Sequence, residues 1–292
     1  MPSLADHHAS RFVKLLFLGD AKSGKTTAIG SLVRAGYTVR ILDFDNLLET
    51  LVKRIQHECP DRLGSVEART MRDIPKATDS GMKFSSTPKA WIDSLKMLNV
   101  WKYTDAITGE VIDFGKPSEW GENVILVIDS LTRWSDAALD YHEAVGGALD
   151  GRMQYYNAQL DVERQIAGLT SSGFATNVIV ICHGVLQDRP DGTKKMFPKS
   201  VGSALNPLIP TYFPNFIQLA KTGEKRTIKL ISSPMIDLAT TDHAALPKEL
   251  DADDGLAKFF AALKGQHAKK ADPEPSAPTA LPRPATLTLK RV

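Results

Sequence analysis

The sequence predicts an α/β fold: a mainly parallel sheet with helices on both faces and a C-terminal antiparallel hairpin. Its strand-like segments are apolar along their whole length instead of alternating with polar residues, which is typical of strands buried on both faces. Segments with helical periodicity lie between these strands, as they do in sheets covered by helices. Near the end, residues 213–220 and 226–232 flank the turn sequence KTGEK, which predicts the hairpin.

The first half of the chain begins with an apolar strand that runs into a glycine. Residues 12–18 (FVKLLFL) form this strand, and a helix over 25–35 follows and ends near Gly36. We then expect, in order, a strand at 38–45, a helix at 46–58, a short strand at 65–70 and a helix at 88–98 with Pro88 in its first turn.

The second half begins with a turn-rich, aromatic insert at 101–121, in which DAITGEVIDFG resembles a hairpin. An apolar strand at 123–129 leads to a long helical region that is interrupted at 146–151, and a further apolar strand covers 177–183. The last predicted helix ends at Gly265. Its apolar face, which should dock on the core, consists of Leu256, Phe259, Phe260 and Leu263.

One domain, at 12–265, is predicted between a flexible N-terminus at 1–11 and a tail at 266–292. The tail holds 5 prolines and a net charge of +3, which leaves −1 for the rest of a chain whose formal net charge is +2. Such a segment buries too little apolar surface to offset the entropy of ordering it, so we expect a disordered, Pro-rich basic tail. It is either a solvated tether or a contact for nucleic acid or an acidic partner.

The composition favours a cytoplasmic protein without a membrane partner. Hydrophobic residues make up 42% of the 292 residues, which is enough for a sizeable core. No run approaches the roughly 18 consecutive apolar residues of a membrane span, and the start, MPSLADHHASRF, lacks the apolar segment of a secretory signal. Cys59 and Cys182 are too few for a metal or disulfide framework, so we expect reduced, buried thiols.

The stretch LFLGDAKSGKTTAIG, residues 16–30, carries the pattern G-x-x-x-x-G-K-T. Between an apolar strand and a helix, this pattern predicts a loop whose backbone N–H groups turn toward phosphates. Lys25 should reach the β and γ phosphates, Thr26 should be a ligand of Mg²⁺, and Thr27 should lie near the α-phosphate. The predicted nucleotide-binding residues are Gly19, Asp20, Ala21, Lys22, Ser23, Gly24, Lys25, Thr26 and Thr27.

A second motif, VILVIDS, supplies a carboxylate for the metal. Asp129 ends an apolar strand, as the Walker B aspartate of P-loop proteins does. The alternative role of Asp129 is a helix N-cap, although Ser130 is the better candidate for that cap. Thr26 and Asp129 are therefore the predicted metal ligands, and ATP and Mg²⁺ the predicted cofactors.

The residues after Asp129 separate the classes of P-loop protein. A GTPase would carry D-x-x-G, but the chain continues Ser130-Leu131-Thr132, and it has the strand-like TVRILDFD between the two motifs, which GTPases lack. The arginine-rich lid of a nucleoside kinase is not apparent. These observations favour an ATPase in which a carboxylate on a neighbouring strand polarises the attacking water.

Four stretches carry a resemblance to a known family: FLGDAKSGKTT, ILDFD, LVIDSLTRW and VIVICHG. Over residues 12–235 the chain resembles the RecA-like ATPases. Among these it is most similar to phage-encoded ATPases of single-strand annealing and recombination. The resemblance implies that Asp45 is the catalytic base, at a position where the family usually has glutamate, and that His183 senses the γ-phosphate. The alternatives are that Asp45 caps the helix at 46–58 and that His183 is an ordinary strand-end residue.

The same resemblance implies ATP hydrolysis at the interfaces of a homo-oligomeric ring or filament, where a neighbouring subunit supplies a cation. The stretch KTGEKRTIK offers Arg226 for this role, beside Lys221, Lys225 and Lys229. The predicted catalytic residues are thus Lys25, Asp45, His183 and Arg226.

Single-stranded DNA is the partner implied by the resemblance, which places nucleic acid at loops after the Walker B helix and after the next strand. Residues 185–207 form the second such loop, where cations could follow a phosphate backbone and an aromatic ring could stack on a base. The predicted DNA-binding residues are Arg189, Lys194, Lys195, Phe197 and Lys199. The alternative is a solvated hairpin that turns at Asp191-Gly192.

The sequence leaves other functions open. The same fold serves hexameric helicases and packaging motors, and P-loop kinases act on small molecules. A nucleotide-bound scaffold with negligible turnover is a further alternative because Asp45 stands where glutamate is usual. For the leading hypothesis, a single-strand-binding protein is a candidate further partner, and a bacterial host cytoplasm is the expected location if the protein is phage-encoded.

Overall fold

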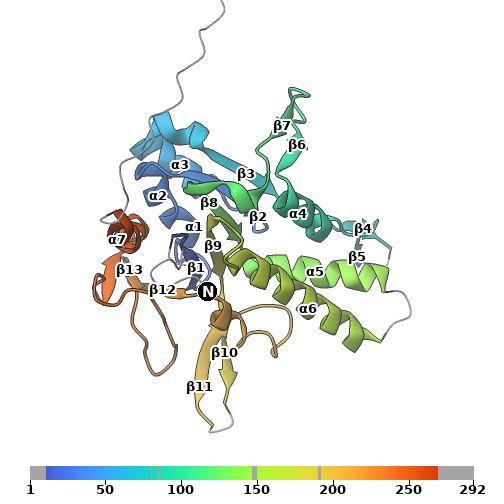
Figure 1. The fold of residues 1–292 in the computed structure, drawn as a ribbon. Helices are drawn as coiled ribbons and strands as arrows, with labels where there is room; N and C mark the ends of the chain where they lie inside the picture. Colours follow the sequence, from blue (N-terminus) through green and yellow to red (C-terminus); the bar gives the residue numbers. More distant parts are fainter. Residues whose placement is uncertain (1–10, 80, 85, 147–149, 190–191, 269–292) are drawn as a thin grey trace, which may run out of the picture.

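The computed structural model describes residues 11–79, 81–84, 86–146, 150–189 and 192–268. Its centre is an eight-stranded sheet of order β14-β13-β12-β1-β9-β8-β2-β3 (Figure 1). The strands are β1 (Lys14–Gly19), β2 (Thr38–Asp43), β3 (Val66–Thr70), β8 (Gly121–Asp129), β9 (Thr176–Cys182), β12 (Asn215–Thr222), β13 (Lys225–Lys229) and β14 (Glu249–Asp251). Every pairing from β12 to β3 is parallel, whereas β13 and β14 pair antiparallel. The predicted fold class and C-terminal hairpin are confirmed.

Helices cover both faces of the sheet (Figure 1). On one face lie α1 (Lys25–Ala28), α2 (Gly30–Arg34), α3 (Glu49–Glu58) and α7 (Gly255–Ala268), and on the other lie α4 (Ala90–Asn99), α5 (Leu131–Val145) and α6 (Gly151–Thr170). Alternate strand residues feed the two cores: Leu15 and Phe17 pack with the first group, Leu16 and Leu18 with the second. This two-sided burial explains why the strand sequences are apolar throughout.

Three small hairpins extend from this body. They are β4 (Lys76–Thr78) with β5 (Gly81–Lys83), β6 (Lys102–Thr104) with β7 (Val111–Asp113), and β10 (Gly184–Asp188) with β11 (Lys194–Pro198). The second confirms the hairpin expected in the insert at 101–121, and it projects on the opposite side of the view from β10–β11 (Figure 1). Short 3-10 turns cover Pro60–Ser65, Pro117–Glu119 and Ile209–Tyr212.

Helix ends differ from the prediction for local reasons. The α3 helix begins at Glu49 instead of residue 46, because the Asp43 carboxylate accepts a hydrogen bond of 2.8 Å from the Asn46 N–H and Asn46 adopts a φ of 56°. The α7 helix continues to Ala268, so the predicted stop at Gly265 is wrong. The predicted flexible N-terminus and basic tail lie almost wholly outside the described residues. Within the described ranges, no helix has the length and apolarity needed to cross a membrane.

A buried lysine joins β1 to the start of β9. Lys14 is 5% exposed, and its ammonium donates hydrogen bonds to the carbonyl oxygens of Phe174 (2.7 Å) and Thr176 (2.8 Å). It also lies 4.7 Å from the centre of the Phe174 ring. Burial lowers the pKa of Lys14 from 10.5 to about 7.

This pKa predicts how stability depends on pH. The unfolded chain binds more protons than the folded chain between about pH 7 and 10.5, so the contribution of Lys14 to stability rises with pH across that window. Between about pH 7.5 and 9, the free energy of unfolding of the wild type should rise by roughly 1 kcal/mol per pH unit relative to Lys14→Met, as measured by urea unfolding. Identical pH slopes for the two proteins would contradict a depressed pKa.

Candidate active site

The predicted motifs meet at one edge of the sheet, where the parallel strands β1, β9, β8 and β2 end. Asp43 lies opposite Asp129 in the register of β2 and β8, and Leu18 lies opposite Cys182 in that of β1 and β9. The phosphate loop leaves this edge from Gly19. Ligands of open α/β sheets bind at the carboxyl ends of the strands, so this edge is the candidate active site.

The loop from Gly19 to Lys25 has the geometry of a phosphate cradle. A Cβ atom on Gly19 would come within 2.9 Å of both the Leu219 carbonyl oxygen and Ser23 Oγ, so only glycine fits there. Lys25 is buried, and its ammonium donates hydrogen bonds to the carbonyl oxygens of Gly19 (2.7 Å) and Asp20 (2.8 Å). Ser23 Oγ is buried and has no hydrogen-bond partner among the described residues. These donors fit a polyphosphate that would accept from them.

Thr26 and Asp129 form the candidate magnesium site. The Thr26 hydroxyl donates a hydrogen bond of 2.5 Å to Asp129 Oδ2. Burial raises the pKa of Asp129 to about 7, opposed by the hydrogen bond from Thr26. A hydroxyl beside a carboxylate suits Mg²⁺, which usually takes one or two protein carboxylates together with waters and substrate phosphates. Across the described ranges, no group of three or more His, Cys, Asp or Glu residues is placed to hold a metal.

Asp45 points toward this site and is held by the residue that follows Asp129. The Ser130 hydroxyl donates a hydrogen bond of 3.2 Å to Asp45 Oδ1. Ser130 occupies the N-cap position of α5 without capping it through the side chain, and α3 has Leu48 at its N-cap. The expected side-chain cap by Ser130 and the alternative cap by Asp45 are therefore both wrong. The carboxylate of Asp45 is thereby oriented beside the candidate magnesium site.

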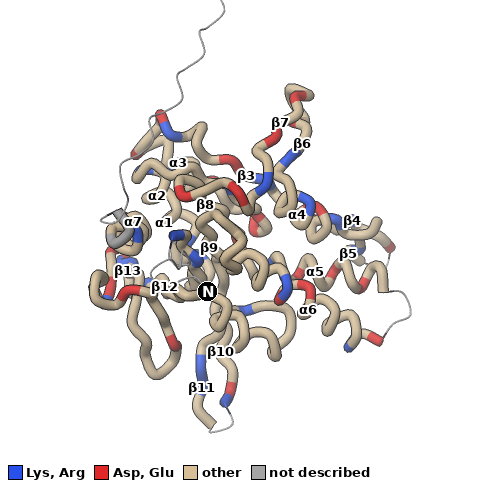
Figure 2. Tube along the Cα trace, in the orientation of Figure 1, with Lys and Arg blue, Asp and Glu red and all other residues tan. Residues whose placement is uncertain are grey.

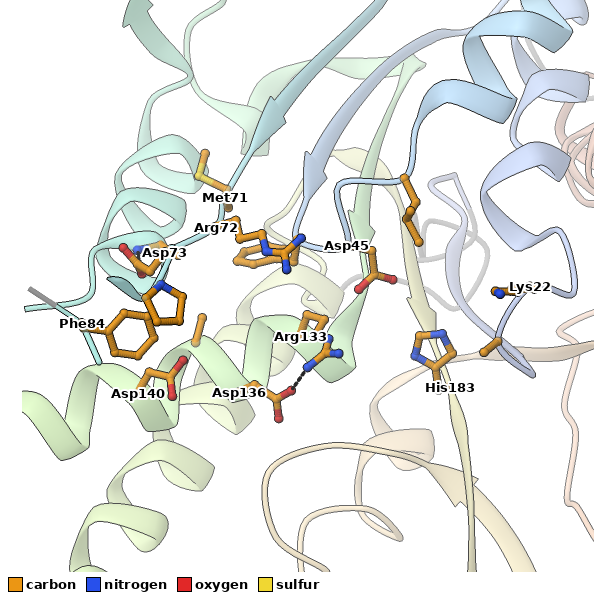
Figure 3. Close-up of a pocket in the computed structure, with 16 residues that line it drawn as sticks. Lys22, Asp45, Met71, Arg72, Asp73, Phe84, Arg133, Asp136, Asp140 and His183 are labelled. Atoms are coloured by element: carbon orange, nitrogen blue, oxygen red, sulfur yellow. Dashed lines mark hydrogen bonds and ion pairs between the residues drawn. The ribbon is translucent and has the colours of Figure 1, made fainter. Parts of the chain in front are cut away.

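His183 follows β9 directly and lies across the site from Asp45 (Figure 3). Burial lowers the pKa of His183 and the Lys25 ammonium lowers it further, so the imidazole is neutral near pH 7. Its backbone is fixed on both sides: its N–H donates to Thr132 Oγ1 (3.3 Å), and its carbonyl oxygen accepts from the Lys199 N–H (2.8 Å). A neutral imidazole here can donate a hydrogen bond to a phosphate oxygen.

A cleft of about 430 Å³ opens from Lys22, Asp45 and His183 (Figure 3). Its far wall is formed by Arg72, Asp73 and Phe84 and by the α5 residues Arg133, Asp136 and Asp140. Arg133 Nη1 lies 3.2 Å from Asp136 Oδ2. Burial and the neighbouring acidic residues raise the pKa of Asp140 to about 6. The sequence motifs do not include these residues, although Arg133 lies in the first turn of α5, four residues after Asp129.

Arg226 lies against the phosphate loop of its own chain. A Cβ atom on Gly24, the residue before Lys25, would come within 3.0 Å of Arg226 Nη1. The sequence had suggested Arg226 as a cation for the nucleotide of a neighbouring subunit. The structure brings Arg226 from β13 to the phosphate loop of the same chain, and its role toward a neighbouring subunit stays a prediction.

The predicted DNA-binding residues lie on and after the β10–β11 hairpin, which corresponds to the alternative of a hairpin near Gly192 (Figure 2). Lys194 and Lys199 are exposed, whereas Phe197 is half-buried. Lys195 is only 12% exposed and forms an ion pair with Asp237, and Arg189 lies 3.9 Å from the same carboxylate. Lys194 lies 3.8 Å from Asp188 Oδ1, but its side chain is 65% exposed and can face an external phosphate together with the exposed Lys199.

No family model and no curated protein matches the sequence. Solved structures that match part of the chain include an ATPase from the type III secretion system of pathogenic bacteria, at 15% identity and a TM-score of 0.40, over 72% of this chain and 52% of that chain. Another is the assembled ATPase EscN in complex with its central stalk EscO, from enteropathogenic E. coli, at 14% identity and a TM-score of 0.42, over 89% of this chain and 54% of that chain. The chain spans about half the length of these structures.

The Thr26–Asp129 pair yields the next prediction. Asp129→Asn keeps the size of the side chain and removes the charge that a metal requires, so the variant should fold with a similar thermal midpoint. Its Mg²⁺-dependent ATP hydrolysis should fall by roughly a hundredfold, the loss typical of removing one preorganised electrostatic contact. Steady-state phosphate release over a Mg²⁺ titration measures the effect, and unchanged turnover would remove Asp129 from the metal site.

Proposed function

We propose that this protein binds ATP with Mg²⁺, hydrolyses it, and acts on single-stranded DNA in recombination or strand annealing as a homo-oligomer. The observation that carries the hydrolysis proposal is the hydrogen bond from Thr26 to Asp129, with Lys25 in the same loop and Asp45 held next to the pair by Ser130. Phosphoryl-transfer sites need a cradle, a metal carboxylate and a residue that orients the attacking water. This arrangement supplies a candidate for each part.

Each residue has a defined role in this proposal. Thr26 and Asp129 would hold Mg²⁺, whose charge would offset the charge of the phosphates when it is bound. Lys25 would exchange its carbonyl partners, at 2.7 and 2.8 Å, for phosphate oxygens. Asp45 would accept a proton from water or orient it, and His183 would donate a hydrogen bond to the terminal phosphate. Ser130 would fix the Asp45 carboxylate.

The DNA proposal is supported by the position of the β10–β11 hairpin. It projects from the body and carries exposed lysines (Figure 2). Its base is tied to the active site, because Thr132 Oγ1 donates a hydrogen bond of 3.0 Å to the Lys199 carbonyl oxygen and accepts one from the His183 N–H. Through these contacts, DNA on the hairpin would influence the γ-phosphate side of the site.

The test of the proposed function is ATP hydrolysis with and without single-stranded DNA, for the wild type and Lys25→Ala. We expect Mg²⁺-dependent phosphate release by the wild type that increases with DNA, and a loss of at least roughly a hundredfold in the variant, because the ammonium no longer offsets phosphate charge. Equal rates in the two proteins would mean that the loop is not the active site. An absence of hydrolysis with intact ATP binding would favour the scaffold function.

A small-molecule kinase is the second candidate, and the cleft beside Asp45 and His183 is the observation that favours it. At about 430 Å³, the cleft is large enough for a small phosphoryl acceptor. The two functions differ in their products. An ATPase releases one inorganic phosphate for each ADP formed, whereas a kinase forms ADP without releasing phosphate when its acceptor is present. Parallel assays of ADP and phosphate in a metabolite extract distinguish them.

The hairpin predicts a salt-dependent interaction. Each lysine that neutralises a DNA phosphate releases counterions, so replacing both Lys194 and Lys199 by alanine should lower the slope of log affinity against log salt by up to about 1.4 for single strands. Lys53→Ala is the matched control, because Lys53 is exposed on α3, away from the hairpin (Figure 1). Fluorescence anisotropy with a labelled oligonucleotide measures the slope. If the double variant and the control bind alike at every salt concentration, the hairpin does not contact DNA.

A further inference from the structure

We propose that Arg226 binds the nucleotide held in the phosphate loop of its own chain, at the α-phosphate, and thereby sets nucleotide affinity without taking part in the chemical step. The inference rests on the proposed ATP binding. It assigns to Arg226 a role opposite to that of a cation contributed to a neighbouring subunit, and it is carried by the placement of β13.

The backbone of β13 fixes the direction of the Arg226 side chain. Arg226 pairs with Lys221 of β12, and its carbonyl oxygen accepts a hydrogen bond of 3.2 Å from the Ala252 N–H. Side chains of a strand alternate between faces, so Arg226 shares its face with Ile228, which is buried in the core beneath α1 and α7. The strand therefore directs Arg226 toward the start of α1, where the phosphate loop ends.

The contact with the loop involves the last part of the side chain. A Cβ atom on Gly24 would come within 3.0 Å of Nη1, 3.5 Å of Cζ and 3.6 Å of Cδ of Arg226. Gly24 has a φ of 102°, a conformation that residues with side chains rarely adopt. The missing side chain is what lets the guanidinium approach the loop backbone.

Charge explains what the guanidinium is placed to bind. Its nitrogens make no hydrogen bond or ion pair with the residues that the structure describes. The loop carries Lys22 and Lys25 against Asp20, so Arg226 adds to an excess of positive charge that a bound anion would offset. A guanidinium binds phosphate oxygens through paired N–H donors, which makes a nucleotide phosphate the matching ligand.

The order of the strands in the sheet indicates which phosphate of the nucleotide Arg226 would contact. Asp129, Asp45 and His183 come from β8, β2 and β9, on one side of β1, and Arg226 comes from β13, on the other side. A nucleotide whose terminal phosphate lies toward the acids and His183 has its nucleoside end toward β12 and β13. Arg226 therefore faces the α-phosphate, which ATP and ADP share. An interaction made equally with substrate and product changes affinity and leaves kcat unchanged.

The first experiment compares Arg226→Ala with Lys229→Ala, an exposed cation on the same strand that lies on the other face. Dissociation constants for ATP and ADP with Mg²⁺ are measured by calorimetry, and kcat at saturating ATP. We expect Arg226→Ala to weaken both nucleotides by the same factor, roughly tenfold to a hundredfold, with kcat within about twofold of wild type. Lys229→Ala should match the wild type in both dissociation constants and in kcat. A loss confined to ATP or to kcat would overturn the proposal, because it would place Arg226 at the γ-phosphate.

The second experiment tests whether Arg226 binds the nucleotide of its own chain or that of a neighbouring subunit. Arg226→Ala and Lys25→Ala chains are co-expressed, purified as mixed oligomers and assayed at an ATP concentration near the wild-type KM. If Arg226 served a neighbour, interfaces in the mixture would unite an intact Lys25 with an intact Arg226 and recover wild-type turnover per competent site. Binding within one chain predicts no recovery, because no chain holds both residues. Failure of wild-type protein to bind ATP or ADP would instead refute the proposed function and is seen before either variant is made.

Discussion

The parallel pairing of β1, β9, β8 and β2 is the constraint on which the candidate site depends. It brings Gly19, Cys182, Asp129 and Asp43 to one edge of the sheet, although they belong to four distant segments of the chain. A slip of one residue in β8 would turn Asp129 to the opposite face and replace it by Ile128 or Ser130. The two apolar cores prevent that slip, because it would carry Val127 and Ile128 into the wrong core. Packing on both faces thus determines the position of the Asp129 carboxylate.

Burial makes unpaired charges unfavourable at the same edge of the sheet. It lowers the pKa of Lys25 and raises that of Asp129 to about 7, so each charge is disfavoured there without a partner. A polyphosphate would support the charged ammonium, and a divalent cation would support the charged carboxylate. The loop therefore gains most from ligands of both signs together. The carbonyl oxygens of Gly19 and Asp20 hold Lys25 until then.

Local pattern predicted the phosphate loop and the strands of the main sheet other than β14, since apolar runs and a glycine-rich turn act over a few residues. It failed where a distant contact decides the outcome. Ser130 was expected to cap α5, but its hydroxyl bonds to Asp45, a residue of the turn after β2. Lys195 was expected to be free for DNA, but Asp237 pairs with it across the fold.

The remaining differences between the predicted and the observed structure also arise from contacts between distant segments. The approach of Arg226 to Gly24 depends on how β13 is added to the sheet, which no local pattern encodes. The cleft combines α5 with the irregular segment that contains Arg72 and Asp73, where the sequence shows no periodicity. Gly265 is an ordinary helix stop by composition, yet α7 continues through it. Each of these features is a property of assembled elements.

The residues on the two sides of β1 have different proposed roles in the site. In the proposed mode of binding, Arg226 would face the part of the nucleotide that hydrolysis leaves unchanged, whereas His183 and Asp45 would face the terminal phosphate, which hydrolysis removes. Thr132 joins the β10–β11 hairpin to the second group, because it bonds to His183 and to Lys199. A segment can respond to ATP as distinct from ADP only if its contacts differ between the two states. If His183 contacts the terminal phosphate as proposed, the hairpin would meet that condition through His183. The difference between the nucleotides would then reach the predicted DNA surface from the γ-phosphate side, while Arg226 would set the affinity for both from the opposite side.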